Sequence, residues 1–332
     1  MTLLVAASNP GGANAVMPVA RELMRQHDVV CIIEGTAREV FEKGGVPYVD
    51  VSTVSDKGIL DLLDARKVVF FLYGSSIGAT IEKKLLTECS KRSITSMALV
   101  DFWSNYWQRF STGKKDFAYM PEFICVIDDM MKQQMLDEGF QEGTLLVTGN
   151  PFFDHFADGI TTNHEDRTLI LIISQPLQEL EQYEGGNPFG YNEHEVLRGI
   201  TSILKEFPEF KPKVRLHPRD QKGKYNGVEY DNEDLTSSLS KAGIVIGMNS
   251  MVLFQAAIAG KIVISYQPHL KQDVLVSNSM GLSILVQRPS DLRTLLRRYA
   301  DGRLQAPRKA DESIIPHATK NVVSEINKLL NI

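Results

Sequence analysis

Short apolar runs alternate with segments of helical periodicity over the first 150 residues. Leu3–Ala7 is an apolar run, Val16, Val19 and Leu23 then recur at the spacing of a helix that buries one face, and Val29–Ile33 is the next run. This alternation predicts βαβ units and a mostly parallel sheet of about seven strands. The further strands are expected at Tyr48–Val51, Val68–Leu72, Ile94–Val100, Phe123–Ile127 and Leu145–Thr148, with helices near 77–90 and 129–138.

The pattern breaks around 155–167, where the sequence HFADGITTNHEDR is polar and aperiodic, and a second wound unit follows. We therefore expect an N-terminal Rossmann-like domain over 1–155, a linker over 156–167, a C-terminal Rossmann-like domain over 168–312, and a helix over 313–332 that packs back toward the first domain. The second set of strands is expected at Leu169–Ile173, Val214–Leu216, Ile244–Ile246, Ile262–Tyr266 and Ile284–Val286, with helices near 193–205, 250–259 and 290–299, the last capped by Ser290.

The predicted fold class is α/β, with two doubly wound parallel-sheet domains that face a cleft. Ligands of such sheets bind outside the carboxyl ends of the strands, so the segments that follow strands are the candidate walls of this cleft.

Composition narrows the class of protein. The chain has 332 residues, of which 43% are hydrophobic and 23% charged, as expected for a globular enzyme rather than a disordered or membrane protein. A net charge of −5 disfavours an extended nucleic-acid surface. Cys31, Cys89 and Cys125 are too far apart for a zinc site, and the first apolar run is too short for a signal peptide. We expect a cytoplasmic protein, with peripheral association at the inner membrane face as an option.

The connection after the first strand reads Ser-Asn-Pro-Gly-Gly. Gly11 and Gly12 allow a ligand to approach backbone N–H groups at a helix start, although the segment is not a dinucleotide-binding GxGxxG motif. Two interpretations stay open: a loop that binds an acceptor substrate, and a tight connection that needs small residues.

A second candidate segment, residues 101–110, follows a predicted strand and contains both tryptophans. Trp103, Asn105 and Arg109 are typical of a carbohydrate surface, because sugar CH faces stack on aromatic rings and hydroxyls bond to planar polar groups. Asp101 is the candidate catalytic base for an acceptor hydroxyl. The alternative is that the aromatic rings pack between helices and Asp101 caps one.

Asp128 and Asp129 end another strand. One acidic pair without a third ligand is a weak metal signal, and the favoured interpretation is that Asp129 caps the following helix. We expect neither a metal nor a bound cofactor.

The segment Arg215-Leu216-His217-Pro218-Arg219 is the sharpest feature of the second half. It places His217 at a strand end with Arg215 and Arg219 beside it, an arrangement that can bind a phosphate. A histidine at a strand end is also a common surface residue.

The next strand end carries small polar residues. Asn249 and Ser250 open a helix, where backbone N–H groups bind anions, although Ser250 would also serve as a simple N-cap. Ser174 follows the first strand of this domain and is a further nucleotide-binding candidate; the polar stretch from there to Tyr191 is a candidate mobile loop.

Three stretches carry a resemblance. VTGNPFFD resembles the segment at the domain junction of hydrolysing UDP-N-acetylglucosamine 2-epimerases, RLHPRD resembles the His-Pro motif of bacterial sialyltransferases, Kdo transferases and glycerophosphotransferases, and GMNSMVLFQAAIAGKIVI resembles the donor-binding stretch of both groups. The resemblance to these GT-B enzymes implies that His217 binds the donor phosphate and that Ser250 and Asn249 hold phosphate or ribose. Gln255 stands where many of these enzymes have a glutamate for the ribose.

The leading functional prediction is a metal-independent glycosyltransferase of surface polysaccharide or glycoconjugate synthesis. It would take a CMP-, CDP- or UDP-linked sugar and a glycan or lipid-linked acceptor. One alternative is a nucleotide-sugar 2-epimerase or hydrolase, which needs several acids around the sugar ring. A second is a GT-B-like protein that binds without turnover.

Overall fold

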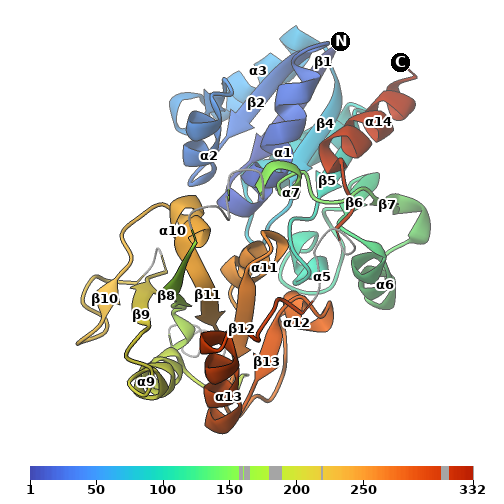
Figure 1. Cartoon of the computed structure of the whole chain (residues 1–332). Coiled ribbons are helices and arrows are strands. Elements are labelled where there is room, and N and C mark those ends of the chain that lie inside the picture. Colours follow the sequence, from blue (N-terminus) through green and yellow to red (C-terminus); the bar gives the residue numbers. More distant parts are fainter. Residues whose placement is uncertain (157–159, 161–164, 179–188, 218–219, 308–313, 332) are drawn as a thin grey trace. The chain divides into compact units, whose positions relative to one another are not determined.

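The chain is described by a computed structural model that covers residues 1–156, 160, 165–178, 189–217, 220–307 and 314–331. It forms two compact units, which we describe separately. Unit 1 consists of Met1–Asp154 and Ile314–Ile332, and unit 2 consists of His155–Ser313 (Figure 1). The predicted cleft stays a prediction.

Unit 1 is built on a seven-stranded sheet in the order β3-β2-β1-β4-β5-β6-β7, with every neighbouring pair parallel. The central strands read as apolar runs because helices cover both faces of a parallel sheet. The strands are β1 (Thr2–Ala7), β2 (Asp28–Ile33), β3 (Val49–Asp50), β4 (Val68–Gly74), β5 (Thr95–Leu99), β6 (Phe123–Val126) and β7 (Leu145–Val147).

The helices of unit 1 include those predicted near 77–90 and 129–138, together with helices over 37–44, 56–66 and 106–109 that the apolar pattern did not predict. The helices are α1 (Pro10–Leu23), α2 (Ala37–Gly44), α3 (Asp56–Arg66), α4 (Ile81–Lys91), α5 (Tyr106–Arg109), α6 (Asp129–Asp137) and α14 (Ala318–Leu330); two 3-10 turns span Val51–Thr53 and Glu142–Thr144, and α7 (Phe153–Phe156) lies where the two units meet in sequence. The prediction for α6 was wrong by one residue, because Asp128 rather than Asp129 accepts the capping hydrogen bond, from the Met131 N–H at 2.7 Å.

The C-terminal helix α14 belongs to unit 1. Val322 and Ile326 are fully buried in the same hydrophobic core as Val16 of α1. Asp154 accepts hydrogen bonds from the first N–H groups of the helix, those of Ala318 at 2.8 Å and Thr319 at 2.7 Å. A carboxylate at a helix N-terminus satisfies unpaired donors and is favoured by the helix dipole, so this contact fixes where α14 begins.

Unit 2 contains a six-stranded parallel sheet in the order β10-β9-β8-β11-β12-β13. Its strands are β8 (Asp166–Ile173), β9 (Lys211–Arg215), β10 (Glu229–Tyr230), β11 (Ala242–Gly247), β12 (Ile262–Tyr266) and β13 (Ile284–Val286). The short edge strand β10 was not predicted, because two residues carry no periodicity. The two sheets confirm the predicted fold class of two Rossmann-like α/β domains.

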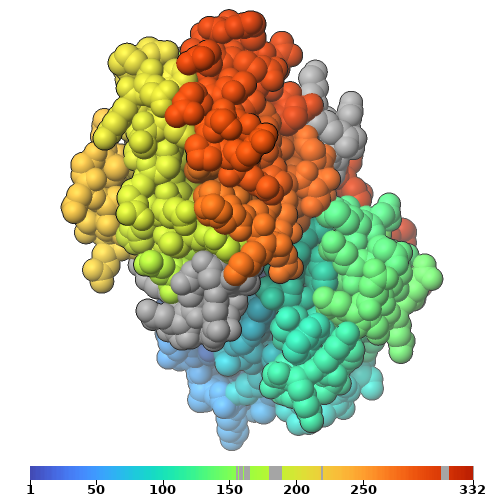
Figure 2. Space-filling model, turned by 90° about the horizontal axis from the view of Figure 1, so that it is seen from below, coloured from blue at the N-terminus to red at the C-terminus, as the bar shows by residue number. Residues whose placement is uncertain are grey.

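Five helices of unit 2 are described: α9 (Glu193–Leu204), α10 (Leu235–Lys241), α11 (Met251–Ile258), α12 (Val276–Ser279) and α13 (Pro289–Ala300). The cap prediction for α13 was wrong: the helix starts at Pro289, whose fixed φ suits the first helical position, and Ser290 lies inside the first turn. Arg293 of α13 pairs with Glu206, just after α9, through two 2.7 Å hydrogen bonds, and the two helices lie side by side in Figure 2.

Each sheet has one point where the winding direction reverses. In unit 1 this switch point lies between β1 and β4, and in unit 2 between β8 and β11. The loops that leave two such strands run in opposite directions and open a crevice, which is where doubly wound folds bind ligands. The two switch points therefore define where candidate sites are sought. In the described ranges, no helix is both long and apolar enough to span a bilayer.

Candidate functional sites at the two switch points

The switch point of unit 2 brings two loops together. Gln175 follows β8, and its Oε1 accepts a hydrogen bond from the backbone N–H of Asn249, after β11, at 2.9 Å. Behind them, Ser265 Oγ donates to the carbonyl of Met248 at 2.7 Å, and Gln267 Nε2 donates to Ser265 Oγ at 2.6 Å. The backbone before α11 is thus fixed by fully buried polar side chains.

Ser250 is the N-cap of α11. Its Oγ accepts a hydrogen bond from the Val252 N–H at 3.3 Å, so the capping role is observed. In the preceding residue, Asn249 Oδ1 is buried and lacks a hydrogen-bond partner within the described residues. A buried polar atom without a partner costs free energy unless a ligand or water satisfies it, so this residue is a candidate ligand contact. Gln255 lies one turn further along the helix and is half-buried.

His217 lies two residues after the end of β9, on a support that the sequence did not reveal. Asp220 is fully buried, and its Oδ2 accepts hydrogen bonds from the His217 backbone N–H at 3.1 Å and from Ser174 Oγ at 2.9 Å. Lys224 donates to Asp220 Oδ1 at 2.6 Å. The Ser174 hydroxyl is therefore engaged beneath the His217 segment. Arg219 lies outside the described residues, as does most of the predicted mobile loop after Ser174.

Lys224 neutralises part of this buried acidic cluster. Burial lowers the pKa of its ammonium group, but hydrogen bonds to Asp220 and to Glu193, at 2.9 Å, outweigh burial and raise the pKa overall. Lys224 thus stays charged, and Glu193 in turn accepts a hydrogen bond from the Gln178 N–H at 3.1 Å. The signal that could have identified the cluster is the final residue of RLHPRD, which is Asp220.

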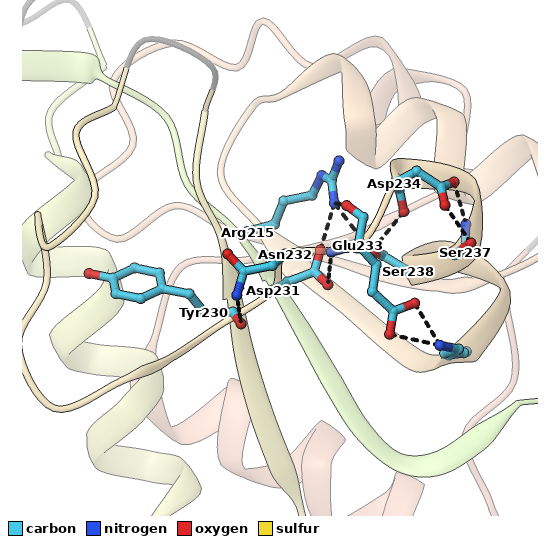
Figure 3. Close-up of polar contacts among 9 residues, drawn as sticks. Arg215, Tyr230, Asp231, Asn232, Glu233, Asp234, Ser237 and Ser238 are labelled. Atoms are coloured by element: carbon cyan, nitrogen blue, oxygen red, sulfur yellow. Dashed lines mark hydrogen bonds and ion pairs between the residues drawn. The ribbon is translucent and has the colours of Figure 1, made fainter.

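Arg215 points to a different partner from the one predicted. Its guanidinium donates to Asp231 Oδ2 at 2.6 Å, to the Glu233 carbonyl at 2.8 Å and to Ser238 Oγ at 3.2 Å (Figure 3). This network joins β9 to the segment between β10 and α10. All three acceptors bind Nη1, so the structure shows Arg215 bonded at the sheet edge, and its predicted contact with a phosphate stays a prediction.

The switch point of unit 1 is organised around Asp101, which follows β5. Asp101 Oδ1 pairs with Arg109 at 2.6 Å, and the same guanidinium donates to the Ser75 carbonyl, after β4, at 2.8 Å. Asn150 of the VTGN segment donates to the Asp101 carbonyl at 3.0 Å. Asp101, the predicted base, is therefore held through its backbone carbonyl by Asn150 and through Oδ1 by Arg109.

The glycines of the first loop allow two close approaches. A Cβ on Gly11 would overlap Oδ2 of Asp101 and lie 3.0 Å from its Cγ. A Cβ on Gly12 would lie 2.9 Å from the carbonyl oxygen of Gly74 at the end of β4. Both predicted residues are thus small because α1 starts against the end of β4 and against the carboxylate of Asp101.

The aromatic segment is largely packed. Trp103 is buried, donates from Nε1 to Asp128 Oδ2 at 2.9 Å, and stacks on Phe153 with the ring centroids 6.3 Å apart. Asn105 is exposed, with a left-handed backbone (φ 57°), directly before α5. The geometry of Trp103 favours the packing alternative over a sugar-stacking ring.

Two polar residues at this switch point were not singled out by the sequence. Glu82 in the first turn of α4 is 1% exposed and accepts a hydrogen bond from Ser8 Oγ at 2.8 Å. Its Oε2, and the Oγ of Ser76 after β4, are buried with no partner among the described residues. Burial is the main cause that raises the pKa of Glu82.

Metal and thiol chemistry find no support in the described part of the chain. It contains no group of three His, Cys, Asp or Glu side chains able to hold a metal ion. Cys31, Cys89 and Cys125 are buried free thiols, and desolvation raises the pKa of each to about 12. Thiolates, the reactive form, are therefore disfavoured.

Solved structures resemble the whole chain. A UDP-GlcNAc 2-epimerase from Neisseria meningitidis, bound to UDP-GlcNAc, matches with a TM-score of 0.69 and 15% identity over 99% of this chain and 100% of its own. A UDP-GlcNAc 2-epimerase from Methanocaldococcus jannaschii, in complex with UDP-GlcNAc and UDP, matches with a TM-score of 0.67 and 14% identity. The match covers 99% of this chain and 100% of that protein. The glycotransferase of kitacinnamycin matches with a TM-score of 0.57 and 13% identity, over 97% of this chain and 93% of its own.

The chain has a GT-B-like fold. No protein-family model and no curated protein matches the sequence. At 15% identity or less the likeness to the 2-epimerases and to the glycotransferase shows a shared fold, and the narrower resemblance to sialyltransferases and Kdo transferases gains no support from these structures.

Proposed function

We propose that this protein is a nucleotide-sugar 2-epimerase that acts on a UDP-linked N-acetylhexosamine. The observation that carries the proposal is that the GT-B-like fold of several 2-epimerases extends over 99% of the chain, with the predicted polar residues at the switch point of each sheet. This function replaces sugar transfer as the favoured prediction.

Unit 2 supplies the groups for the nucleotide phosphates. The N-terminus of α11 presents backbone N–H groups beside Asn249 and Ser250, and helix N-termini attract anions. His217, supported through Asp220, follows β9, which is separated from β11 by β8 alone. The half-buried Gln255 on α11 is the proposed contact for the ribose.

Unit 1 supplies the proton-transfer chemistry. Inversion of a sugar carbon that carries hydrogen requires that one proton leaves and another arrives, so at least two proton-transferring groups are needed. Asp101 is the proposed base, because its Oδ2 faces the Gly11 end of the first loop while Oδ1 stays paired with Arg109. A transferase needs a base for its acceptor but no proton exchange at C2.

Sugar transfer is the second candidate, since one structural neighbour is a glycotransferase. The two functions differ in what happens without an acceptor. The purified protein should convert UDP-GlcNAc to its C2 epimer when no acceptor is present, whereas consumption of the donor only after addition of an acceptor would favour transfer.

Two variants separate binding from chemistry. Asp101→Asn should abolish turnover while UDP still raises the melting temperature, because the phosphate groups lie in unit 2. His217→Ala should remove the UDP-dependent shift. Full turnover by Asp101→Asn would rule out Asp101 as the base, and an unchanged UDP shift in His217→Ala would remove His217 from the phosphate site.

A further inference from the structure

Glu82 is a buried carboxyl whose bonding is incomplete. Its Oε1 accepts the hydrogen bond from Ser8 Oγ at 2.8 Å, while Oε2 is buried with no partner among the described residues. Ser8 itself is half-buried, at the end of β1 and at the switch point of unit 1. The Ser8 hydroxyl therefore links the loop after β1 to the enclosed carboxyl of Glu82.

No lysine or arginine of the described ranges bonds to the Glu82 carboxyl to neutralise a negative charge there. Lys83 donates to the carbonyl of Ser111 at 2.9 Å rather than to Glu82. Burial raises the pKa of Glu82, the Ser8 hydrogen bond lowers it in part, and the acidic Glu34 raises it again. The enclosed Tyr73 is the other titratable neighbour.

Two carboxyl groups thus border one short connection, Ser8 to Gly12. Asp101 reaches it at Gly11 and faces the cation of Arg109. Glu82 reaches it at Ser8 and, within the described ranges, forms no ion pair with an arginine or lysine. Pairs of carboxyl groups placed in such different surroundings are the arrangement by which enzymes obtain a base and an acid from the same residue type.

We propose that Ser8 and Glu82 form the second proton-transfer pair of the active site, complementary to Asp101. For this step the Ser8 hydroxyl, which donates to Glu82 Oε1 in the structure, turns toward the reacting sugar and gives up its proton. The protonated Glu82 carboxyl then donates its proton to Ser8 Oγ and becomes a carboxylate, and a proton from solvent restores the carboxyl after turnover. Ser8 touches the substrate in this scheme, and Glu82 acts through Ser8 as a positioning and proton-holding residue. The inference rests on the proposed function.

A pH-dependent stability measurement tests the protonated carboxyl without any ligand. Because the folded-state pKa of Glu82 is raised, its favourable contribution is complete below the usual value of 4.5 and is lost as the pH rises through the folded-state pKa. Glu82→Gln should therefore become progressively more stable relative to the wild type as the pH increases above 4.5.

Glu88 on the same helix is the matched control. Hydrogen bonds from Lys91 and Arg92 lower its pKa, so its contribution is present above the usual pKa and is lost as the pH falls. Glu88→Gln should show the opposite trend. A Glu82→Gln difference that does not change with pH would overturn the assignment of a proton to Glu82.

Kinetics with UDP-GlcNAc test the relay. Glu82→Gln and Ser8→Ala should each reduce kcat by about a hundredfold with KM unchanged, as for loss of a general acid, while Glu88→Gln keeps the wild-type kcat. An unchanged kcat in folded Glu82→Gln or Ser8→Ala would overturn the relay. A wild-type protein without turnover would instead overturn the proposed function, and the pH experiment would still decide whether Glu82 holds a proton.

Discussion

Replacement of Gly11 by alanine probes the contact on which the proposed base depends. Gly11 is the second residue of α1, and a Cβ there would overlap Oδ2 of Asp101. The carboxylate has to turn away, and the turn breaks its 2.6 Å ion pair with Arg109. The guanidinium, 8% exposed, would keep only its backbone acceptors, the carbonyls of Ser75 and Ser104.

The expected size follows from two opposing effects. In a helix, alanine is more favourable than glycine by about 1 kcal/mol. Separation of a buried ion pair with one charge left behind costs about 3–5 kcal/mol. The side chain of Asp101 is 18% exposed, which places the cost toward the lower end of that range. Gly11→Ala should therefore destabilise unit 1 by about 2 kcal/mol, the sign opposite to helix propensity.

Urea unfolding followed by tryptophan fluorescence is the suitable assay, because both tryptophans of the chain, Trp103 and Trp107, lie in unit 1. Gly143→Ala is the control, since a Cβ at that position meets nothing within 4 Å. In an Asp101→Ala background, Gly11→Ala should become neutral or stabilising. If Gly11→Ala matched the wild type in stability, or if its effect persisted without Asp101, the contact between Gly11 and the Asp101 carboxylate would not be the cause.

Three further outcomes are expected. Lys261→Met should destabilise unit 2 by roughly 2 kcal/mol or more in calorimetry, because the 1% exposed ammonium bonds to Glu165 and to the carbonyls of Ser240 and Ala242; an unchanged melting temperature would contradict this. Ser250→Ala should cost about 1 kcal/mol from the lost N-cap and weaken UDP binding in titration calorimetry, whereas wild-type affinity would place the phosphate elsewhere. Turnover should be unchanged by excess EDTA, and inactivation that Mg²⁺ reverses would contradict metal independence.

The strands could be predicted because parallel sheets bury both faces. Leu3–Ala7, for example, appears as an unbroken apolar run and is fully buried in β1. The ends of helices and strands were harder to predict from the sequence. Asp128 and Asp129 are chemically equivalent in sequence, and only the backbone geometry decides that Asp128 caps α6. The two-residue β10 has no sequence pattern at all.

Candidate site residues could be singled out where they directly follow a predicted strand. The side chains that hold these residues in place could not, because they lie on other parts of the chain. His217 and Asp101 were singled out as candidates because each follows a predicted strand, and the structure adds the side chains that hold them, Asp220 and Arg109. Glu82 was missed since it lies in a helix whose polar positions resemble a solvated face. Its burial depends on the packing of α4 beside β1, a contact distant in sequence.

Solvent isotope exchange at C2 distinguishes epimerisation from sugar transfer. When the protein and UDP-GlcNAc are incubated in D2O without an acceptor, an epimerase exchanges the hydrogen at C2 with solvent. For an epimerase, NMR of the recovered nucleotide sugar should show the C2 epimer with deuterium at C2, and Asp101→Asn should give neither. The contrary result has two parts: UDP-GlcNAc is recovered without deuterium when no acceptor is present, and it is consumed once an acceptor hydroxyl is supplied. That result would contradict epimerisation and favour sugar transfer.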